Sequence, residues 1–273
     1  MKESELITLS KEVLTICEEA SSAVMDIYGA DNDGIEIKQD GSPVTLADLS
    51  SHRIISERLS NIDLLFPILS EEDTKKEYTD APIFWLVDPL DGTKEFINRN
   101  GEFTVNVALI ENGKPILGVV AAPAVGEVFY GIPGFGSFKI ANDVEHRITT
   151  SEQDQSNCRI TLSKSHQSKA DEDFIAETKN HFQSVETVPA GSSLKLCRVA
   201  ENSADIYCRL GPTFQWDIAA GQAVAEGSGA SVKDLSGQSL SYEFKAETKN
   251  PYFYCAADSK YPWQEILETL DLD

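Results

Sequence analysis

The sequence is poor in basic residues, and this shortage excludes two classes of partner. Its 23 lysines and arginines stand against 45 aspartates and glutamates, which gives a net charge of −22. Nucleic acid and anionic membrane surfaces bind basic patches, so neither is expected as the main partner. Charges beyond roughly 8 Å are screened at physiological salt, so a small anionic ligand stays compatible with this chain if local cations hold it.

Long apolar runs and paired cysteines are also lacking. No run approaches the roughly 20 residues of a spanning helix, and the N-terminal MKESELITLSKEVLTICEEA has no uncharged apolar core like that of a signal peptide. The five cysteines are odd in number and form no CxxC pair. They predict reduced, buried thiols in a cytoplasmic protein and give no support to a zinc site.

The first half of the chain predicts two helices followed by strands. Apolar residues recur at helical spacing over 5–29, and Thr45 is placed as the N-cap of a helix over 46–61. Short apolar runs at 66–69 and 83–87 are typical of strands buried on both faces. An antiparallel meander is expected over 103–140, with a hairpin turn at the Gly131–Gly136 cluster, which lacks the following helix of a phosphate loop.

The polar stretch TTSEQDQSN at 149–157 is the expected boundary between two halves, residues 1–150 and 151–273. Beyond it, strands and helices alternate. We expect strands at 158–163, 184–189, 205–210, 231–235 and 251–257, and helices at 169–180, 192–203 and 216–227. This alternation is typical of an α/β second half after an α+β first half.

Acidic side chains follow the two buried strands. Asp88-Pro89-Leu90-Asp91-Gly92-Thr93 places two carboxylates on a corner fixed by proline and glycine. Such neighbours repel each other unless a cation neutralises them, and hard oxygen ligands favour Mg²⁺. A lone DxxD is more often a structural turn, but Glu71-Glu72 at the end of the preceding strand weakens that interpretation.

Two further acids have structural alternatives. Asp217 follows Trp216 at a helix start, where the helix dipole favours an acid. Asp48 lies three residues after Thr45, which is the spacing of a capping box. Taken singly, each is best explained as a helix-terminal residue.

Together these motifs resemble the lithium-sensitive, Mg²⁺-dependent phosphatase superfamily that includes inositol monophosphatases and fructose bisphosphatases. The matching segments extend over nearly the whole chain: 40–48 (DGSPVTLAD), 69–72 (LSEE), 85–96 (WLVDPLDGTKEF) and 216–221 (WDIAAG). The resemblance implies a layered αβαβα sandwich of the inositol monophosphatase and sugar phosphatase type. Within the superfamily the chain looks most like the 3′(2′),5′-bisphosphate nucleotidases of the CysQ type, on the segments 93–96 (TKEF), 163–166 (SKSH), 191–195 (GSSLK) and 209–213 (RLGPT).

The resemblance implies a set of metal ligands. One Mg²⁺ would be held by Glu71, Asp88 and the carbonyl of Leu90, and a second by Asp88, Asp91 and Asp217. It also allows a third, weaker ion near Glu71. In this two-metal scheme one ion lowers the pKa of the attacking water and the other offsets charge on the leaving oxygen.

The same resemblance implies the catalytic and substrate contacts. Thr93 would pass a proton from the water to Asp48, the general base. The substrate would be 3′-phosphoadenosine 5′-phosphate (PAP), cleaved to AMP and phosphate in PAP recycling and sulfur assimilation, with the sulfated analogue PAPS as a second substrate. The implied substrate contacts are Glu71, Leu90, Asp91, Gly92, Thr93, His166, Ser192, Lys195, Arg209 and Asp217. Taken by themselves, Lys195 predicts a solvated helix charge and His166 an ordinary surface or core residue.

Two rival functions remain open from the sequence. Inositol monophosphatase or sugar bisphosphatase activity would use the same metals, and the Lys94-Glu95 pair with Ser192, Lys195 and Arg209 argues for the nucleotide. A non-catalytic metal-binding regulatory protein is disfavoured by the intact acidic positions. We expect a monomer or weak dimer in the cytoplasm, and peripheral association with the cytoplasmic face of the inner membrane is left open.

Overall fold

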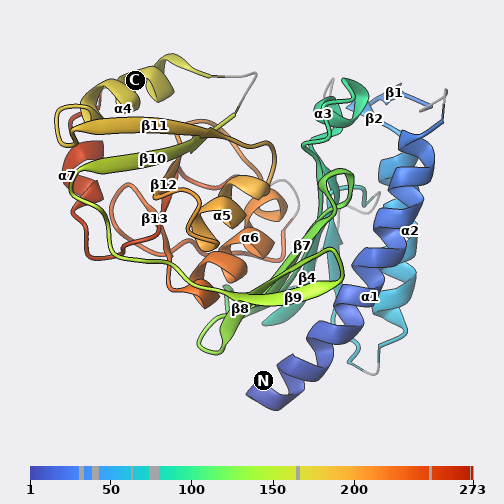
Figure 1. Cartoon of the computed structure of the whole chain (residues 1–273). Helices are drawn as coiled ribbons and strands as arrows, with labels where there is room; N and C mark the ends of the chain where they lie inside the picture. Colours follow the sequence, from blue (N-terminus) through green and yellow to red (C-terminus); the bar gives the residue numbers. More distant parts are fainter. Residues whose placement is uncertain are drawn as a thin grey trace.

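The computed structural model describes residues 1–30, 34–38, 43–62, 64–73, 80–163, 167–245, 248–270 and 272. In this part of the chain two sheets and three groups of helices stack as five layers (Figure 1). A helical pair lies outside a seven-stranded sheet, a second pair lies between the two sheets, and a third pair covers the five-stranded sheet. The predicted layered αβαβα sandwich is confirmed.

The outer layer of the first half consists of α1 (Glu3–Tyr28) and α2 (Leu46–Ser60). The apolar stripe of α1 predicted from spacing is the buried one, and α1 packs against α2 and the seven-stranded sheet. Thr45 caps α2 as predicted, because its hydroxyl oxygen accepts the amide proton of Ala47 at 3.1 Å. A two-stranded ribbon of β1 (Glu36–Ile37) and β2 (Pro43–Val44) precedes α2.

The seven-stranded sheet has the order β3-β4-β5-β6-β7-β8-β9. Strands β3 (Ile68–Ser70) and β4 (Ile83–Asp91) are parallel, so the acids that follow them reach the same sheet edge. The remaining strands form the predicted antiparallel meander and continue it: β5 (Thr104–Glu111), β6 (Lys114–Ala122), β7 (Glu127–Ile132), β8 (Gly136–Ala141) and β9 (Val144–Ile148). A short 3-10 helix, Pro123–Val125, links β6 to β7. The predicted hairpin turn lies between β7 and β8.

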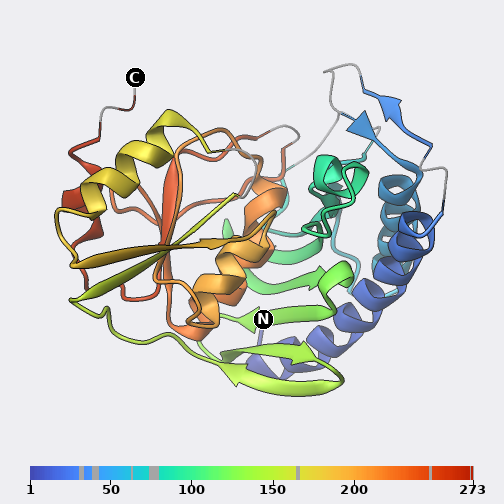
Figure 2. The ribbon, with the colours of Figure 1, turned by 45° about the horizontal axis from the view of Figure 1, so that its top comes forward.

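The middle layer consists of α5 (Leu194–Ala200) and α6 (Gln215–Ser228), which come from the second half of the chain. Helix α6 is buried on nearly all its faces and packs on β5, β6 and β7 of the first sheet (Figure 2). Its backbone approaches the sheet closely where Gly118 lies, since a Cβ there would come within 2.3 Å of the Ala220 carbonyl oxygen. The two halves therefore share one hydrophobic core.

The five-stranded sheet has the order β11-β10-β12-β14-β13. Its strands are β10 (Asn157–Leu162), β11 (Ser184–Pro189), β12 (Ile206–Arg209), β13 (Ser231–Asp234) and β14 (Phe253–Ala256). The first three are parallel, and β14 runs antiparallel to both neighbours, so the sheet is mixed. Helices α4 (Lys169–Thr178) and α7 (Trp263–Leu267) cover its outer face (Figure 1).

Several elements were absent from the sequence prediction: the short strands β1 and β2, the 3-10 helix at Pro123–Val125, and also β9, α7 and α3 (Thr93–Ile97). Four of the five residues of β9 are exposed, so it has no apolar alternation to detect. Helices α3 and α7 have five residues each, too few for the apolar spacing of a helix to recur. The helix expected over 192–203 is shorter in the structure, where it is α5. Among the described residues, no helix is long and apolar enough to cross a membrane.

Candidate active site

Asp48 and Thr93 meet at the junction of α2 and α3. The Thr93 hydroxyl donates to Asp48 Oδ1 at 3.0 Å, and the Thr45 backbone amide and hydroxyl donate to Oδ2 at 2.8 and 2.6 Å. Asp48 therefore completes the capping box and also faces the acidic motif. Burial raises its pKa in spite of these hydrogen bonds.

The Asp88–Thr93 segment differs from the expected corner in one respect. We predicted a turn directly after the buried strand, but β4 continues to Asp91 with a bulge between Asp88 and Asp91. The left-handed turn comes at Gly92, where φ is +90° and a Cβ would lie 2.3 Å from Ser192 Oγ. The bulge is fixed by Ser51, which donates to the Pro89 carbonyl at 2.7 Å.

Four carboxyl groups approach one another at the ends of these elements: Glu71 after β3, Asp88 and Asp91 on β4, and Asp217 in the first turn of α6. Burial and mutual repulsion raise the pKa values of Asp88 and Asp217 well above their ordinary value. Burial raises the pKa of Glu71 to about 7, and also raises that of Asp91 although Lys195 and Ser193 oppose it. The cluster thus brings together carboxyl groups from both halves of the chain, with Asp88 buried and the other three partly exposed.

The donor set suits a hard divalent cation. Clustered carboxylates repel one another at low dielectric, and oxygen ligands without sulfur or imidazole favour Mg²⁺. The described residues nevertheless contain no group of three or more His, Cys, Asp or Glu already arranged as a metal cage. Glu71 lies close enough to Asp88 for its charge to raise the pKa of Asp88 further.

Lys38 reaches the cluster from the β1–β2 ribbon. Its ammonium group lies 3.2 Å from a Glu71 carboxylate oxygen and 2.5 Å from a Glu72 carboxylate oxygen. It is the neighbouring positive charge that opposes the rise in the pKa of Glu71. No motif indicated this lysine, because the two-residue strand that precedes it is too short to show a periodic pattern.

A cavity of about 330 Å³ adjoins Asp91 and Asp217. Its lining contains the predicted residues Asp91, Gly92, Ser192, Lys195, Arg209 and Asp217, together with Lys94, Glu95, Ser163, Tyr207, Thr213 and Ile218. The structure thus brings together predicted residues from four separate motifs.

Two cations of this cavity, Lys195 and Arg209, come from α5 and β12. Lys195 is only 7% exposed, so it is not the solvated charge that a helical lysine usually is. Its ammonium lies 5.6 Å from the centre of the Tyr207 ring, and burial lowers its pKa although Asp91 attracts its charge. Arg209 donates from Nη2 to the Pro212 carbonyl at 2.8 Å, while its buried Nε has no partner among the described residues.

Of the predicted substrate contacts Ser192 and His166, the structure describes only Ser192. The Ser192 hydroxyl lies within hydrogen-bonding distance of the Asp91 and Glu102 carbonyl oxygens, at 3.0 and 2.9 Å, so it already braces the backbone around Gly92. His166 lies outside the described residues, as does the 39–42 segment of the first predicted motif.

Sequence reasoning missed Ser193 and Asn106, which surround Asp91. The Ser193 amide donates to Asp91 Oδ2 at 2.8 Å, and the Asn106 amide donates to the Ser193 hydroxyl at 2.9 Å. Ser193 belonged to a quoted motif, but Asn106 lies in the middle of an apolar strand. A buried asparagine in such a strand is the signal that could have been used.

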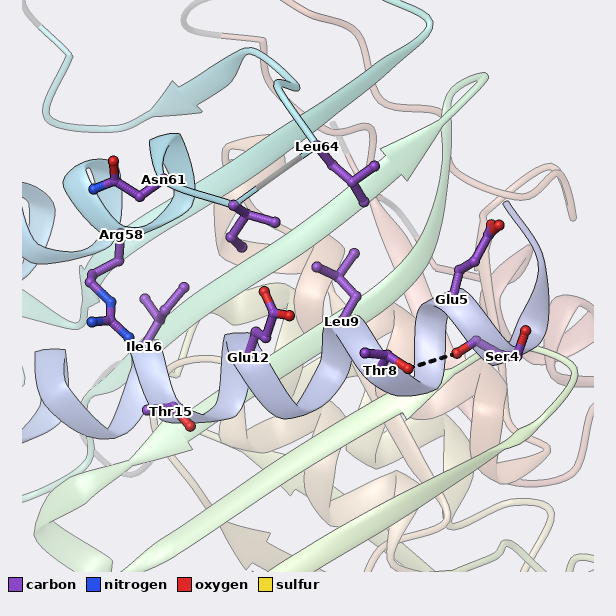
Figure 3. Close-up of a pocket in the computed structure, with 11 residues that line it drawn as sticks. Ser4, Glu5, Thr8, Leu9, Glu12, Thr15, Ile16, Arg58, Asn61 and Leu64 are labelled. Carbon is purple, nitrogen blue, oxygen red and sulfur yellow. Dashed lines mark hydrogen bonds between the residues drawn. The ribbon is translucent and has the colours of Figure 1, made fainter.

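A larger hollow, about 840 Å³, lies between the start of α1 and the end of α2 (Figure 3). It is at the opposite end of α2 from Asp48. Its charged lining residues are Glu5, Glu12 and Arg58, and Arg58 is paired with Glu19. This hollow therefore lacks the grouped acids and buried cations found beside Asp91.

The fold and the acid-lined cavity define a phosphatase of one family, and residues 5–267 match it: the chain belongs to the Inositol monophosphatase family. It is 42% identical over 248 residues to the 3′(2′),5′-bisphosphate nucleotidase CysQ of Salmonella typhimurium, which covers 89% of this chain and 97% of that protein. The protein of the same name from Escherichia coli K12 is 40% identical over 247 residues, with the same shares covered. A crystal structure of CysQ from Bacteroides thetaiotaomicron, described as a bacterial member of the inositol monophosphatase family, has a TM-score of 0.79 at 33% identity and covers 91% of this chain and 97% of that one.

These matches confirm the resemblance recognised in the motifs and the prediction of a hydrolase of the phosphoric monoester class. The family is metal-dependent. The chain covers nearly the full length of these relatives, so the comparison extends over both halves of the fold.

Proposed function

We propose that this protein is a Mg²⁺-dependent phosphomonoesterase that removes the 3′-phosphate of PAP to give AMP and phosphate. The observation that carries this proposal is the cavity in which Asp91 and Asp217 lie beside Arg209 and the buried Lys195. The acids suit divalent cations at the scissile phosphate, and the two basic side chains suit a second phosphate on the same substrate. The names of the relatives support the same activity.

The acids of the cluster would hold two ions. Following the family resemblance, Glu71, Asp88 and the Leu90 carbonyl would bind one Mg²⁺, and Asp88, Asp91 and Asp217 the second, with a third, weaker ion near Glu71. Bound cations would supply positive charge that lowers the pKa of an attacking water and offsets charge on the leaving oxygen. The net charge of −22 makes such local cations necessary for an anionic substrate.

The Thr93–Asp48 pair would move the proton. The attacking water gives a proton to Thr93 Oγ while the Thr93 hydroxyl proton passes to Asp48 Oδ1, 3.0 Å away. The new bond joins the water oxygen to phosphorus, the bond from phosphorus to the 3′-oxygen breaks, and that oxygen takes a proton from solvent. The raised pKa of Asp48 suits this role, because a general base works best when its pKa is near the working pH.

Lys195 and Arg209 would bind the 5′-phosphate that remains on AMP. Both line the cavity next to Asp91, and the Arg209 guanidinium has a buried nitrogen without a partner in the described chain. Ser192 would contribute through the backbone that it braces around Gly92. PAPS, which keeps the 3′-phosphate and carries a sulfated 5′-phosphate, fits the same arrangement as a second substrate.

A direct test compares phosphate release from PAP, inositol 1-phosphate and fructose 1,6-bisphosphate, each with and without Mg²⁺ and Li⁺. We expect PAP to have the highest kcat/KM, no release without Mg²⁺, and inhibition by Li⁺. Preference for inositol 1-phosphate or fructose 1,6-bisphosphate would contradict the assignment of a nucleotide substrate. It would remain consistent with the proposed metal site. Absence of release from all three with Mg²⁺ would favour a non-catalytic regulatory protein.

We also propose a cellular compartment and an oligomeric state for the protein. All five cysteines are buried and free, which fits the reducing conditions of the cytoplasm. We also propose that the protein is a monomer or weak dimer. Size-exclusion chromatography with light scattering would measure the mass directly.

A further inference from the structure

Ser193 occupies the point where three elements of the site meet. It directly precedes α5, is 1% exposed, and contacts β4, β5 and α6. Its amide donates to Asp91 Oδ2 at 2.8 Å, its hydroxyl lies 2.5 Å from the Asp217 carbonyl oxygen, and the same hydroxyl accepts from Asn106 Nδ2 at 2.9 Å.

The hydroxyl has a single proton and two acceptors within reach. The Asp217 carbonyl is at 2.5 Å and Asp91 Oδ2 at 3.2 Å, so the proton goes to the shorter and stronger bond. Asn106 fills one acceptor position of the same oxygen and orients it. The hydroxyl therefore fixes the first turn of α6, which carries Asp217.

The Ser193 amide fixes Asp91 at the same time. Thr104 Oγ1 and Asn106 Nδ2 lie 3.4 and 3.5 Å from Asp91 Oδ2, on the same side as that amide. In the described chain none of the hydrogen bonds uses Oδ1 of Asp91. The carboxylate thus has one oxygen turned to the protein and the other left for a ligand.

We propose that Ser193 is a positioning residue that sets the separation of Asp91 and Asp217, which come from different halves of the chain, so that both can bind one divalent cation. This inference rests on the proposed function, because it requires Asp91 and Asp217 to share an ion. It assigns no catalytic step to Ser193, which acts through the two carboxylates that it holds.

Ser137 provides a matched control. It is fully buried, and its hydroxyl donates to the Val224 carbonyl of α6 at 2.6 Å, as Ser193 donates to that of Asp217. Val224 lies seven residues further along the helix, about 10 Å at 1.5 Å per residue. Both Ser137→Ala and Ser193→Ala therefore remove a buried bond from a hydroxyl to a carbonyl of α6, and only Ser193→Ala removes it at the acids, together with the bond from Asn106.

The experiment measures Mg²⁺ affinity of the full chain by isothermal titration calorimetry, together with melting temperature in EDTA. We expect Ser193→Ala to weaken Mg²⁺ binding by about ten- to a hundredfold, as for other residues that orient metal ligands. Ser137→Ala should lower the melting temperature comparably and leave Mg²⁺ affinity within roughly twofold of wild type, since its bond lies far from the acids. Ser193→Thr, which keeps the hydroxyl, should recover most of the lost affinity.

The outcomes separate the two proposals. If the wild type binds Mg²⁺ and Ser193→Ala binds it with unchanged affinity, the positioning role alone is overturned. The same conclusion follows if Ser137→Ala weakens Mg²⁺ affinity as much as Ser193→Ala does. Wild type that binds no Mg²⁺ would overturn the proposed function and this role with it. If Ser193→Ala does not fold, Asn106→Ala tests the same network by removing the donor to the Ser193 hydroxyl, and unchanged affinity there would also overturn the role.

Discussion

At the scale of single residues, the carboxyl groups of the site lie where burial and mutual repulsion disfavour their charged forms. Burial raises the pKa values of Asp48, Asp88, Asp91 and Asp217, and repulsion between neighbouring carboxylates adds to the effect at Asp88 and Asp217. The hydrogen bonds that reach Asp91 only partly offset this cost. A cluster of like charges in this environment contributes little to folding stability, and perturbed pKa values of this kind are typical of functional sites.

Asp91→Asn should separate the metal role of this residue from its structural role. The amide oxygen can still accept the Ser193 N–H bond, so the melting temperature in EDTA should stay close to that of wild type. Mg²⁺-dependent phosphate release should fall by roughly a hundredfold or more, the scale of losing one electrostatic stabiliser. Asp26→Asn makes the same change at an exposed acid and should have no effect. Full activity of Asp91→Asn would refute the two-metal assignment.

Lys195→Ala should weaken binding of the 5′-phosphate end of PAP. Losing a hydrogen bond to a charged group costs about 1.5–3 kcal/mol, so KM for PAP should rise about tenfold or more. Adenosine 3′-monophosphate lacks the 5′-phosphate and serves as the matched substrate, for which KM should change little. Steady-state kinetics on both substrates decides the matter, and an equal rise in the two KM values would remove Lys195 from the phosphate site.

At the scale of elements, helix α6 joins the site to the core. Its first turn carries Asp217, and its length lies on the seven-stranded sheet, where glycines on β6 and β7 allow close approach. The position of Asp217 therefore depends on how closely α6 packs on the sheet.

Gly118→Ala should displace α6 from the sheet. The new Cβ would lie 2.3 Å from the Ala220 carbonyl oxygen and 2.8 Å from Ala223 Cβ, and both belong to a packed helix. Overpacking of this kind costs about 1–3 kcal/mol, so urea unfolding should show a loss of that size. Gly29→Ala at the end of α1, where the nearest contact is an ordinary 3.5 Å, should change stability little. Equal losses of stability in the two variants would show that the close approach of α6 to Gly118 does not limit the packing of the helix on the sheet.

Elements with an apolar pattern were predicted well, and those without one were missed. The buried stripe of α1 and the burial of β4 follow from spacing, because a helix or strand must turn its apolar residues toward a core. Strand β9 has an exposed face and was missed, since its place depends on pairing with β8.

At the scale of the whole molecule, the acids of both halves couple folding to pH and, under the proposed function, to Mg²⁺ binding. The pKa of Glu71 rises from an ordinary 4.5 to about 7 in the folded chain, so the stability this group contributes is complete below about pH 4.5 and is lost as pH rises through about 7. Protons and Mg²⁺ compete for the same oxygens, because a ligand carboxylate must be deprotonated.

The Mg²⁺-induced rise in melting temperature should therefore be larger at pH 8 than at pH 5.5. At a Mg²⁺ concentration about 100 times Kd, binding contributes about 2.7 kcal/mol, or roughly 5–10 °C for a chain of this size. Differential scanning fluorimetry in EDTA and in Mg²⁺ at both pH values measures this difference. The Asp91→Asn protein should show a much smaller rise at pH 8, and an equal rise in both proteins would place the ion elsewhere.

The sequence by itself determined the layered fold, the family and the acids after the two buried strands. These features lie in local motifs, where spacing and residue type are sufficient. The tertiary structure decided which atoms meet: Ser193 contacts Asn106 across 87 residues and Asp91 across 102, and Lys195 is buried instead of solvated. Such contacts leave no periodic signal, because they arise only when α5 and α6 of one half pack against the sheet of the other.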